Sequence, residues 1–164
     1  MDIPGGSQAI TSVTGVASGK RYAEVVLDVA STATPTTDCI GISPLTGGGS
    51  ANPPRIGGLG LQKNGNIYAY DALVAAGALA LVVTDVVNLA VDCATGNAWV
   101  GRNGTWYNSG DPAAGTGATT VLTLDTFHVS ASHATASTGA KFSLRTQTSQ
   151  FTGSIPSGFS AWYT

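Results

Sequence analysis

Hydrophobic and polar residues alternate in short segments along the chain, and a two-residue period is typical of β-strands with one buried face. Between Tyr22 and Val29 the odd positions are apolar, whereas the even positions include Glu24 and Asp28. This pattern predicts that the odd positions face a core and the even positions face solvent. Since no segment carries an apolar stripe at helical spacing, the sequence predicts an all-β protein.

Similar segments recur with turn residues between them. The predicted strands span residues 22–29, 40–42, 56–61, 66–70, 79–83, 86–92, 97–102, 121–129, 140–144 and 159–163. About ten short strands in one domain favour two stacked antiparallel sheets, a β-sandwich. The residues expected to form its structural core are Val87, Leu89, Val91, Trp99, Phe142 and Phe159.

Tight hairpin turns are predicted where asparagine precedes glycine. Asn64-Gly65 and Asn103-Gly104 are such pairs, and a turn with two positive φ angles prefers them. With a further turn at Thr95-Gly96, residues 86–106 are predicted to run as strand, turn, strand, turn and a short third strand.

Two longer segments are predicted to be loops. Residues 47–54 contain three consecutive glycines and end in two prolines, so we expect a flexible loop with an extended Pro-Pro end. Residues 108–120 are polar and rich in glycine.

The apolar segment 72–91 is long enough to cross a bilayer, but we interpret it differently. It contains Asp85, a carboxylate that is costly inside a membrane. Its second half alternates like a half-buried strand. No membrane span is therefore predicted.

The overall composition indicates one domain with a weakly charged surface. Of 164 residues 43% are hydrophobic and only 10% are charged, with a formal net charge of −2. Because no basic cluster is present, nucleic acid is not an expected partner. The segment Met1–Ser7 has neither the basic nor the apolar part of a signal peptide, so we expect the chain to fold in the cytoplasm of the cell that makes it.

Cys39 and Cys93 lie in apolar surroundings, and two cysteines are too few for a disulfide scaffold. Free buried thiols are the favoured interpretation. A bridge between the two, or a role in metal binding, stays open.

No catalytic residue and no cofactor is predicted. His128 and His133 are five residues apart and Asp125 precedes them, but histidine ligands on one strand prefer an even spacing, so no metal site is predicted and a surface strand and loop are expected instead. Asp85 and Asp92 are seven residues apart, which places them on opposite faces of a regular strand and favours roles in turns over a glycosidase pair.

Four aromatic residues are candidates for contact with a sugar or a protein. Tyr68, Tyr70, Trp106 and Tyr107 would form a ligand-binding platform if their rings were exposed together. The alternative is that they are half-buried strand residues.

Several segments resemble a known family in order and spacing. Residues 18–25 read SGKRYAEV, residues 85–92 read DVVNLAVD, residues 95–106 read TGNAWVGRNGTW, residues 111–117 read DPAAGTG and residues 156–162 read PSGFSAW. This pattern resembles SPRY-type domains, and the last two segments resemble those of the bacteriophage-encoded branch. The resemblance covers about residues 18–164.

The resemblance implies a concanavalin-like or SPRY-like jelly-roll sandwich over residues 18–164 that recognises other molecules and is not an enzyme. For the phage branch it implies a structural protein at the virion surface, as a capsid decoration or a head-fibre or tail-fibre component, with other virion proteins as partners. Residues 1–17 are expected to be a non-globular arm that attaches to a neighbouring subunit, with Ile3, Pro4 and Ile10 as its apolar contacts. The alternative is a receptor-recognition module for a host-surface glycan or protein, and homo-oligomers are open.

Overall fold

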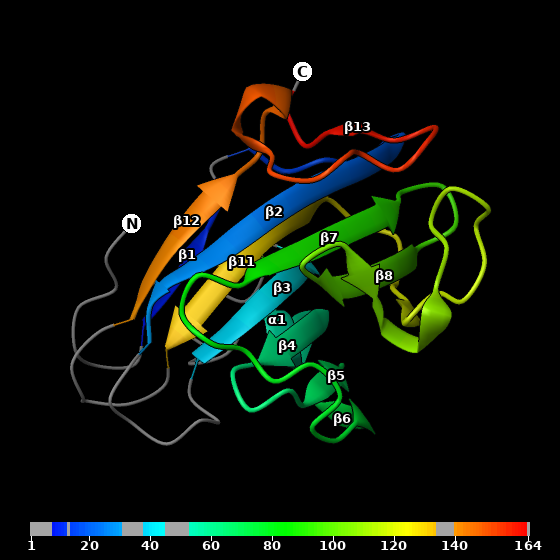
Figure 1. Cartoon of the computed structure of the whole chain (residues 1–164). Helices are drawn as coiled ribbons and strands as arrows, with labels where there is room; N and C mark the ends of the chain where they lie inside the picture. Colours follow the sequence, from blue (N-terminus) through cyan, green and yellow to red (C-terminus); the bar gives the residue numbers. More distant parts are fainter. Residues whose placement is uncertain (1–7, 13, 31–37, 45–52, 134–139, 164) are drawn as a thin grey trace.

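Two β-sheets are stacked face to face in the computed structural model, which describes residues 8–12, 14–30, 38–44, 53–133 and 140–163 (Figure 1). One sheet has the order β1 (Gln8–Thr11), β11 (Phe127–His133), β3 (Asp38–Pro44), β4 (Leu59–Gln62), β5 (Ile67–Ala69) and β6 (Ala72–Ala75). The other has the order β10 (Thr120–Val121), β8 (Asn97–Arg102), β7 (Val86–Asp92), β2 (Lys20–Val29) and β12 (Lys141–Arg145), with β9 (Thr105–Trp106) paired to β8 and β13 (Ser160–Ala161) paired to β2.

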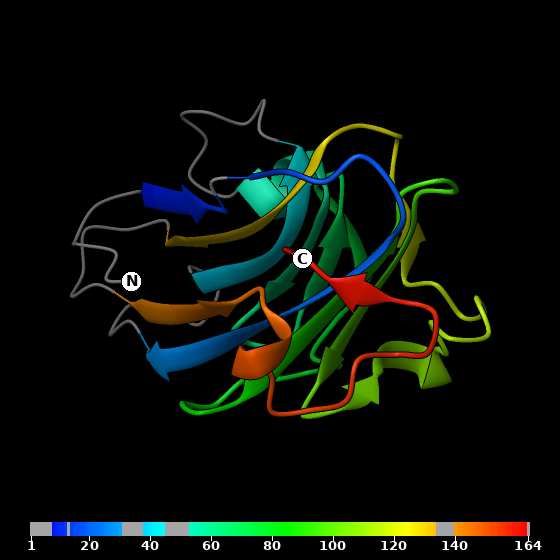
Figure 2. The ribbon, with the colours of Figure 1, turned by 90° about the horizontal axis from the view of Figure 1, so that it is seen from above.

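All strand pairs described are antiparallel except β13 with β2, which is parallel. The view from above shows the two layers, with β1, β11 and β3 in one and β2 and β12 in the other (Figure 2). The predicted all-β sandwich is confirmed. Helical structure in the described residues is limited to α1 (Pro53–Gly57), η2 (Tyr107–Ser109) and η3 (Thr148–Gln150).

The main core lies between the two sheets and consists of aliphatic residues and a few aromatic rings. On β2 it contains Ala23, Val25 and Leu27, three of the four odd positions of the predicted alternation. The prediction is wrong for the fourth, Val29, which is 42% exposed near the end of the strand. Four of the predicted core residues lie in it fully buried, namely Val87, Leu89, Val91 and Phe142. Since each strand contributes every second residue, this face follows the predicted two-residue period.

A second apolar cluster lies on the opposite, outer face of the seven-stranded sheet. It contains Tyr22, Ala90, Trp99 and Phe159. Tyr22 pairs with Ala90, and Ala90 pairs with Trp99, so these residues form a row across three neighbouring strands. The predicted core residues Trp99 and Phe159 are therefore buried, but outside the space between the sheets.

The expectation that the even positions of β2 face solvent is wrong for Tyr22, Glu24 and Val26, and it is right for Asp28. Tyr22 is 1% exposed and Glu24 is 0% exposed, whereas Asp28 is exposed. The reason is that the chain from η3 to β13 lies over this face of the sheet, as the orange and red segment of Figure 1 shows. A strand covered on both sides buries both sets of residues.

The predicted hairpins of residues 86–106 are confirmed as β7, β8 and β9. Asn103 and Gly104 both have positive φ, 51° and 80°, as the predicted two-residue turn requires. A turn also forms at Asn64-Gly65, but here Gly65 has positive φ and Asn64 does not. The reason is that Gln62 N–H bonds to Asn66 O, which closes a loop of three residues where two were predicted.

Three predicted strands have other structures. Residues 56–61 are divided between α1 and β4, and residues 121–129 between β10 and β11. Residues 79–83 form no strand, because the amides of Leu79 and Leu81 bond to two carbonyls of the β4–β5 turn and make no ladder. The strands that were missed are β1 and β6.

The Pro-Pro segment is not extended as predicted: Pro53 and Pro54 begin α1. Proline is tolerated in a first helical turn, where its missing N–H has no partner to bond. Gly60 beneath the helix allows close contact, since a Cβ there would lie 2.9 Å from the Arg55 nitrogen. Residues 45–52 lie outside the described residues.

The predicted N-terminal arm is in part a strand of the sandwich. Gln8–Thr11 pairs with β11, and Val16 forms a bridge to Phe127. Ile10 packs against the main core of its own chain, so the expectation of a non-globular segment is wrong for this part, because the edge of the six-stranded sheet offers it backbone partners. Ile3 and Pro4 lie outside the described residues, and attachment through them stays a prediction.

No helix in the described ranges is long and apolar enough to cross a membrane.

Candidate functional site

The four predicted ligand-binding aromatics do not form one platform. Tyr68 lies on the outer face of the six-stranded sheet, where the Arg55 guanidinium stacks 4.2 Å from its ring centroid. Trp106 lies on the other outside face of the sandwich and packs edge-on against Tyr22, with ring centroids 6.3 Å apart. Because they come from different sheets, these two rings face opposite sides of the molecule.

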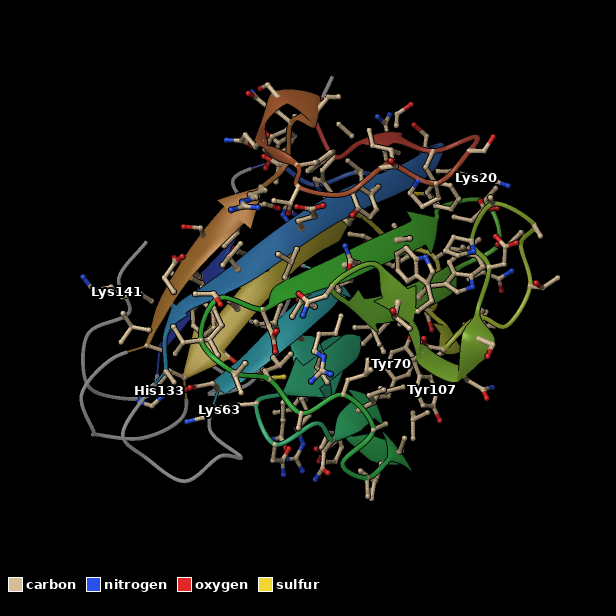
Figure 3. All side chains as sticks on the ribbon, viewed as in Figure 1. Lys20, Lys63, Tyr70, Tyr107, His133 and Lys141 are labelled. Atoms are coloured by element: carbon tan, nitrogen blue, oxygen red, sulfur yellow. The ribbon has the colours of Figure 1, made fainter. Side chains whose placement is uncertain are left out.

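The other two aromatics also have separate environments. Tyr107 is half-buried and packs against the main core. Tyr70 is 43% exposed, and its hydroxyl accepts a hydrogen bond from the Thr123 amide. Figure 3 labels both residues in the lower right part of the molecule. Of the four, Tyr70 is the most open to a ligand.

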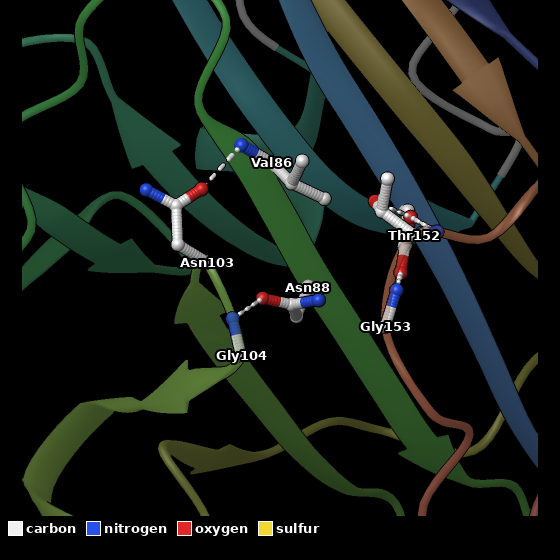
Figure 4. Close-up of a pocket in the computed structure, with 7 residues that line it drawn as sticks. Val86, Asn88, Asn103, Gly104, Thr152 and Gly153 are labelled. Carbon is white, nitrogen blue, oxygen red and sulfur yellow. Dashed lines mark hydrogen bonds between the residues drawn. The ribbon is translucent and has the colours of Figure 1, made fainter.

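A pocket on the outer face of the seven-stranded sheet gathers polar residues that the sequence did not single out as a site. Its cavity volume is about 240 Å³. Glu24 of β2 and Asn88 of β7, neighbours in register, form the floor. The walls are the Asn103-Gly104 turn on one side and the loop of Thr152 and Gly153 on the other, with Val86 completing the lining (Figure 4).

Glu24 is held by donors from the C-terminal loop. Its Oε2 accepts hydrogen bonds from the Thr152 amide at 2.9 Å and the Thr152 hydroxyl at 2.8 Å. Its Oε1 accepts from the Gly153 amide at 3.0 Å and from the Tyr22 hydroxyl at 2.9 Å. The Arg145 guanidinium lies 3.5 Å from Oε2. Each carboxylate oxygen therefore has at least two donors.

These contacts decide the charge of the site. Burial opposes ionisation of Glu24, but the backbone amides of Thr152 and Gly153, together with the two hydroxyls, hold the pKa of this carboxyl below its ordinary value. Burial, and then the negative Glu24, raise the pKa of the Tyr22 hydroxyl, although its bond from Asn88 lowers it. At neutral pH the pair is a carboxylate and a neutral phenol.

The polar network continues from Tyr22 to the opposite wall. The Asn88 side-chain amide donates to the Tyr22 hydroxyl at 2.8 Å, and its oxygen accepts from the Gly104 amide at 2.8 Å. Asn103 accepts from the Val86 amide at 2.9 Å. The two walls of the pocket are thus joined through its floor by a continuous chain of hydrogen bonds.

This arrangement is suited to recognition and poorly suited to proton transfer. Glu24 is the one acidic or basic residue among the described residues that line the pocket. Because it is ionised and already accepts bonds on both oxygens, it would have to lose partners before taking a proton. The backbone and side-chain amides of the pocket already have partners within the chain, so a ligand would contact a rigid surface by its shape and through the remaining acceptor lone pairs.

The histidines that the sequence suggested for a surface strand and loop are buried. His128 is 4% exposed, and its Nδ1 lies 2.9 Å from Ser12 O. His133 is 0% exposed, with Nδ1 2.8 Å from Asp38 Oδ1. Both lie on β11, which is covered on both faces. Among the described residues no group of three or more potential ligands could hold a metal ion.

The aspartates behave as turn residues. Asp92 accepts a hydrogen bond from the Ala94 amide at 3.0 Å. Asp85 accepts from the Val82 amide at 2.9 Å and from the Asn103 side chain at 2.7 Å. The predicted turn roles of both residues are confirmed.

Both cysteines are free and buried, which agrees with the favoured interpretation. Burial raises the pKa of the Cys39 thiol to about 12 and raises that of Cys93 as well. A thiol in such surroundings is a poor nucleophile.

The three lysines of the chain come from β2, the β4–β5 turn and β12. Figure 3 labels Lys20 at the upper right and Lys63 and Lys141 towards the left. They form no basic cluster of the kind that binds a phosphate backbone.

Comparison with known proteins supports the fold. The structure is similar to the crystal structure of the SPRY domain of human HERC1, with a TM-score of 0.57 and 12% sequence identity over 88% of this chain and 91% of that chain. The chain is thus a β-sandwich of the SPRY or concanavalin-like type. No family model matches the sequence, and no curated protein matches it either.

Proposed function

We propose that this chain is a non-catalytic recognition module that binds other proteins, and that it serves as a structural protein at the surface of a bacteriophage virion. The observation that carries the proposal is the pocket over β2 and β7, whose ionised Glu24 is fully engaged by Thr152, Gly153 and Tyr22. Such a site offers shape and hydrogen bonds without a group ready to exchange protons. The SPRY-like fold supports a protein as ligand.

The place in a virion is supported by the sequence resemblance of two segments to the phage branch. The first, residues 111–117, is a compact loop in which Asp111 and Thr116 form a bridge and Thr116 O accepts the Trp99 indole N–H at 2.9 Å. The second, residues 156–162, provides β13. The first segment lies largely at the surface, whereas the second buries Phe159, Ala161 and Trp162. A capsid decoration or a head-fibre or tail-fibre component is the proposed role.

The proposed location in the virion is tested on purified particles of the phage that encodes the chain. Purified virions are analysed by quantitative mass spectrometry and electron microscopy. Near-stoichiometric copies per capsomer support decoration, and a few copies at one vertex or at the tail support a fibre. Absence of the chain from purified particles contradicts the proposal.

A variant tests whether the pocket is the binding site. In Val86→Lys a long charged side chain enters the pocket, while the backbone bond of Val86 to Asn103 is kept. The control is Val121→Lys, at a residue that is 61% exposed and outside the lining. We expect Val86→Lys to reduce incorporation into particles and Val121→Lys to leave it unchanged. Equal incorporation of both would exclude the pocket.

A receptor-recognition module is the second candidate, favoured by the exposed Tyr70 and its apolar neighbours. Thr123 bonds to Tyr70, and Leu124 beside it is 58% exposed. An exposed tyrosine ring in such a setting is suited to stacking on a sugar. A glycan array and a host-cell binding assay test this role, with Tyr70→Ala expected to abolish binding while the particles remain stable.

A further inference from the structure

The apolar segment that resembles a membrane span lies largely on the surface. Residues 72–83 contain only alanine, valine, leucine and one glycine. Yet Leu73 is 53% exposed, Val82 65% and Val83 43%. Soluble monomers rarely expose a continuous apolar stretch of this kind, and where they do it marks an interaction site.

The first part of this segment is β6, the last strand of the six-stranded sheet. In the described part of the chain β6 pairs with β5 alone, so the backbone on its other side is open (Figure 1). The chain that follows turns away from this side, because Gly77 N–H bonds to Asn66 and Leu79 N–H bonds to Gly65. Open edges are usually protected by lysine, proline or an inward charge. The sequence of β6, Ala-Leu-Val-Ala, has none of these.

We propose that β6 is a dimerisation edge, at which a second copy of this chain adds its own β6 in antiparallel pairing. A two-fold axis perpendicular to the sheet keeps every side chain on its own face, so residues that lie opposite each other must come from the same face of β6. With the axis at Leu73, each Leu73 lies opposite Leu73 of the other copy, and each Ala72 lies opposite Val74. An apolar residue thus meets an apolar residue at each of these positions.

Charge favours a second copy as the occupant. Residues 72–83 carry no charged side chain, so two identical edges meet without like-charge repulsion. The nearest charge, Asp71, is already paired to Arg55 at 2.6 Å. A partner of opposite charge would find nothing on this edge to recognise.

The exposed surface beside β6 is smaller than a standard interface, which suits a reversible dimer. A stable homodimer buries roughly 800 Å² on each partner, using about 20 to 30 residues a side. This is close to an eighth of the 6770 Å² surface of the chain. Residues 71–84 contribute eleven exposed residues, and Ile56, 48% exposed, adjoins them through the bond of Asp71 N–H to Arg55 O.

The full-length chain is tested by sedimentation velocity over a range of concentrations. A monomer–dimer equilibrium is expected. In Leu73→Lys a charge is placed on the edge, and the dimer should weaken by at least about tenfold. The control Val121→Lys places the same charge on β10, at the edge of the other sheet, and should leave the equilibrium unchanged. Circular dichroism checks that both variants fold.

The register is tested by mixing two variants. If Leu73 lies opposite Leu73 of the other copy, a mixture of Leu73→Lys with Leu73→Glu restores a dimer through a lysine–glutamate pair, whereas each variant alone places two like charges opposite each other. Any one of four results would overturn the proposal. The wild-type chain could stay monomeric, or it could form species larger than a dimer. Leu73→Lys could leave the dimer intact, or the mixture of variants could fail to associate. The result is independent of the proposed virion role.

Discussion

On its inner face the seven-stranded sheet is buried by aliphatic side chains, whereas on its outer face it is buried by aromatic rings and a hydrogen-bonded carboxylate. Val25 and Leu27 pack into the main core. On the other side of the same strand, Tyr22 and Glu24 lie beneath the C-terminal segment, to which Glu24 is bonded through Thr152. The inner face is held together by nondirectional burial, and the outer face needs specific partners in specific positions. Only the second kind of burial shapes a polar pocket.

The largest expected effect tests how much the outer cluster contributes. Trp99 is 1% exposed, its ring packs edge-on against Phe159, and its indole N–H bonds to Thr116 O. We expect Trp99→Ala to lower the free energy of unfolding by about 3 to 5 kcal/mol. Urea denaturation measures this loss. A loss below about 1 kcal/mol would mean that the outer cluster is not a true core.

Glu24→Gln sharpens the comparison by removing the charge while keeping the size. The amide nitrogen cannot accept from Thr152 or Gly153, so at least one buried donor loses its partner. We expect a loss of about 2 to 3 kcal/mol at pH 7, measured in the same way. The control is Asp28→Asn on the exposed part of β2, whose loss should stay within about 0.5 kcal/mol.

The pH dependence of stability follows from the lowered pKa of Glu24. A carboxyl whose pKa is lower in the folded state than its ordinary 4.5 stabilises the fold above that value, and this contribution is lost as the pH falls through the folded-state pKa. Wild-type stability should therefore decrease more steeply than that of Glu24→Gln below about pH 4.5. Denaturation curves between pH 3 and 7 test this, and parallel profiles would show that Glu24 does not titrate differently on folding.

The smallest expected effect concerns the turn that forms one wall of the pocket. Gly104 has a φ of 80°, and a Cβ added there would meet nothing within 4 Å, so Gly104→Ala costs only backbone strain. We expect a loss of about 1 to 2 kcal/mol. Gly104→Asn should cost less, because asparagine tolerates positive φ. If the two variants were equally destabilised, side-chain contacts rather than strain would be the cause.

Local pattern predicted those parts of the fold that local contacts determine. The bounds of β7 and β8 follow from the alternation of Val86–Asp92 and from the turns on either side, Thr95-Gly96 and Asn103-Gly104. Residues 79–83 show the limit of this reasoning, because an apolar run has the composition of a strand even where its amides bond to a turn.

The candidate site could not be predicted from the sequence, because its partners are remote. Glu24 and Thr152 are 128 residues apart, and nothing in either segment indicates that they meet. Alternation identified Glu24 as an exposed residue, since a two-residue period shows which residues share a face but not whether a later segment covers that face. Knowledge that β13 pairs with β2 would have shown that this face is covered. That pairing is parallel and joins segments remote in the sequence, so no turn residue indicates it.

Hydrogen exchange of the wild-type chain tests most directly whether the C-terminal segment closes the outer face through Glu24. The amides of Thr152 and Gly153 lie in a loop, yet each donates to a buried carboxylate oxygen. We predict that mass spectrometry or NMR will find them protected to a degree comparable with the amides of β2. Exchange of both amides at the rate of an open loop would contradict the account, because the segment would then not be held on the sheet.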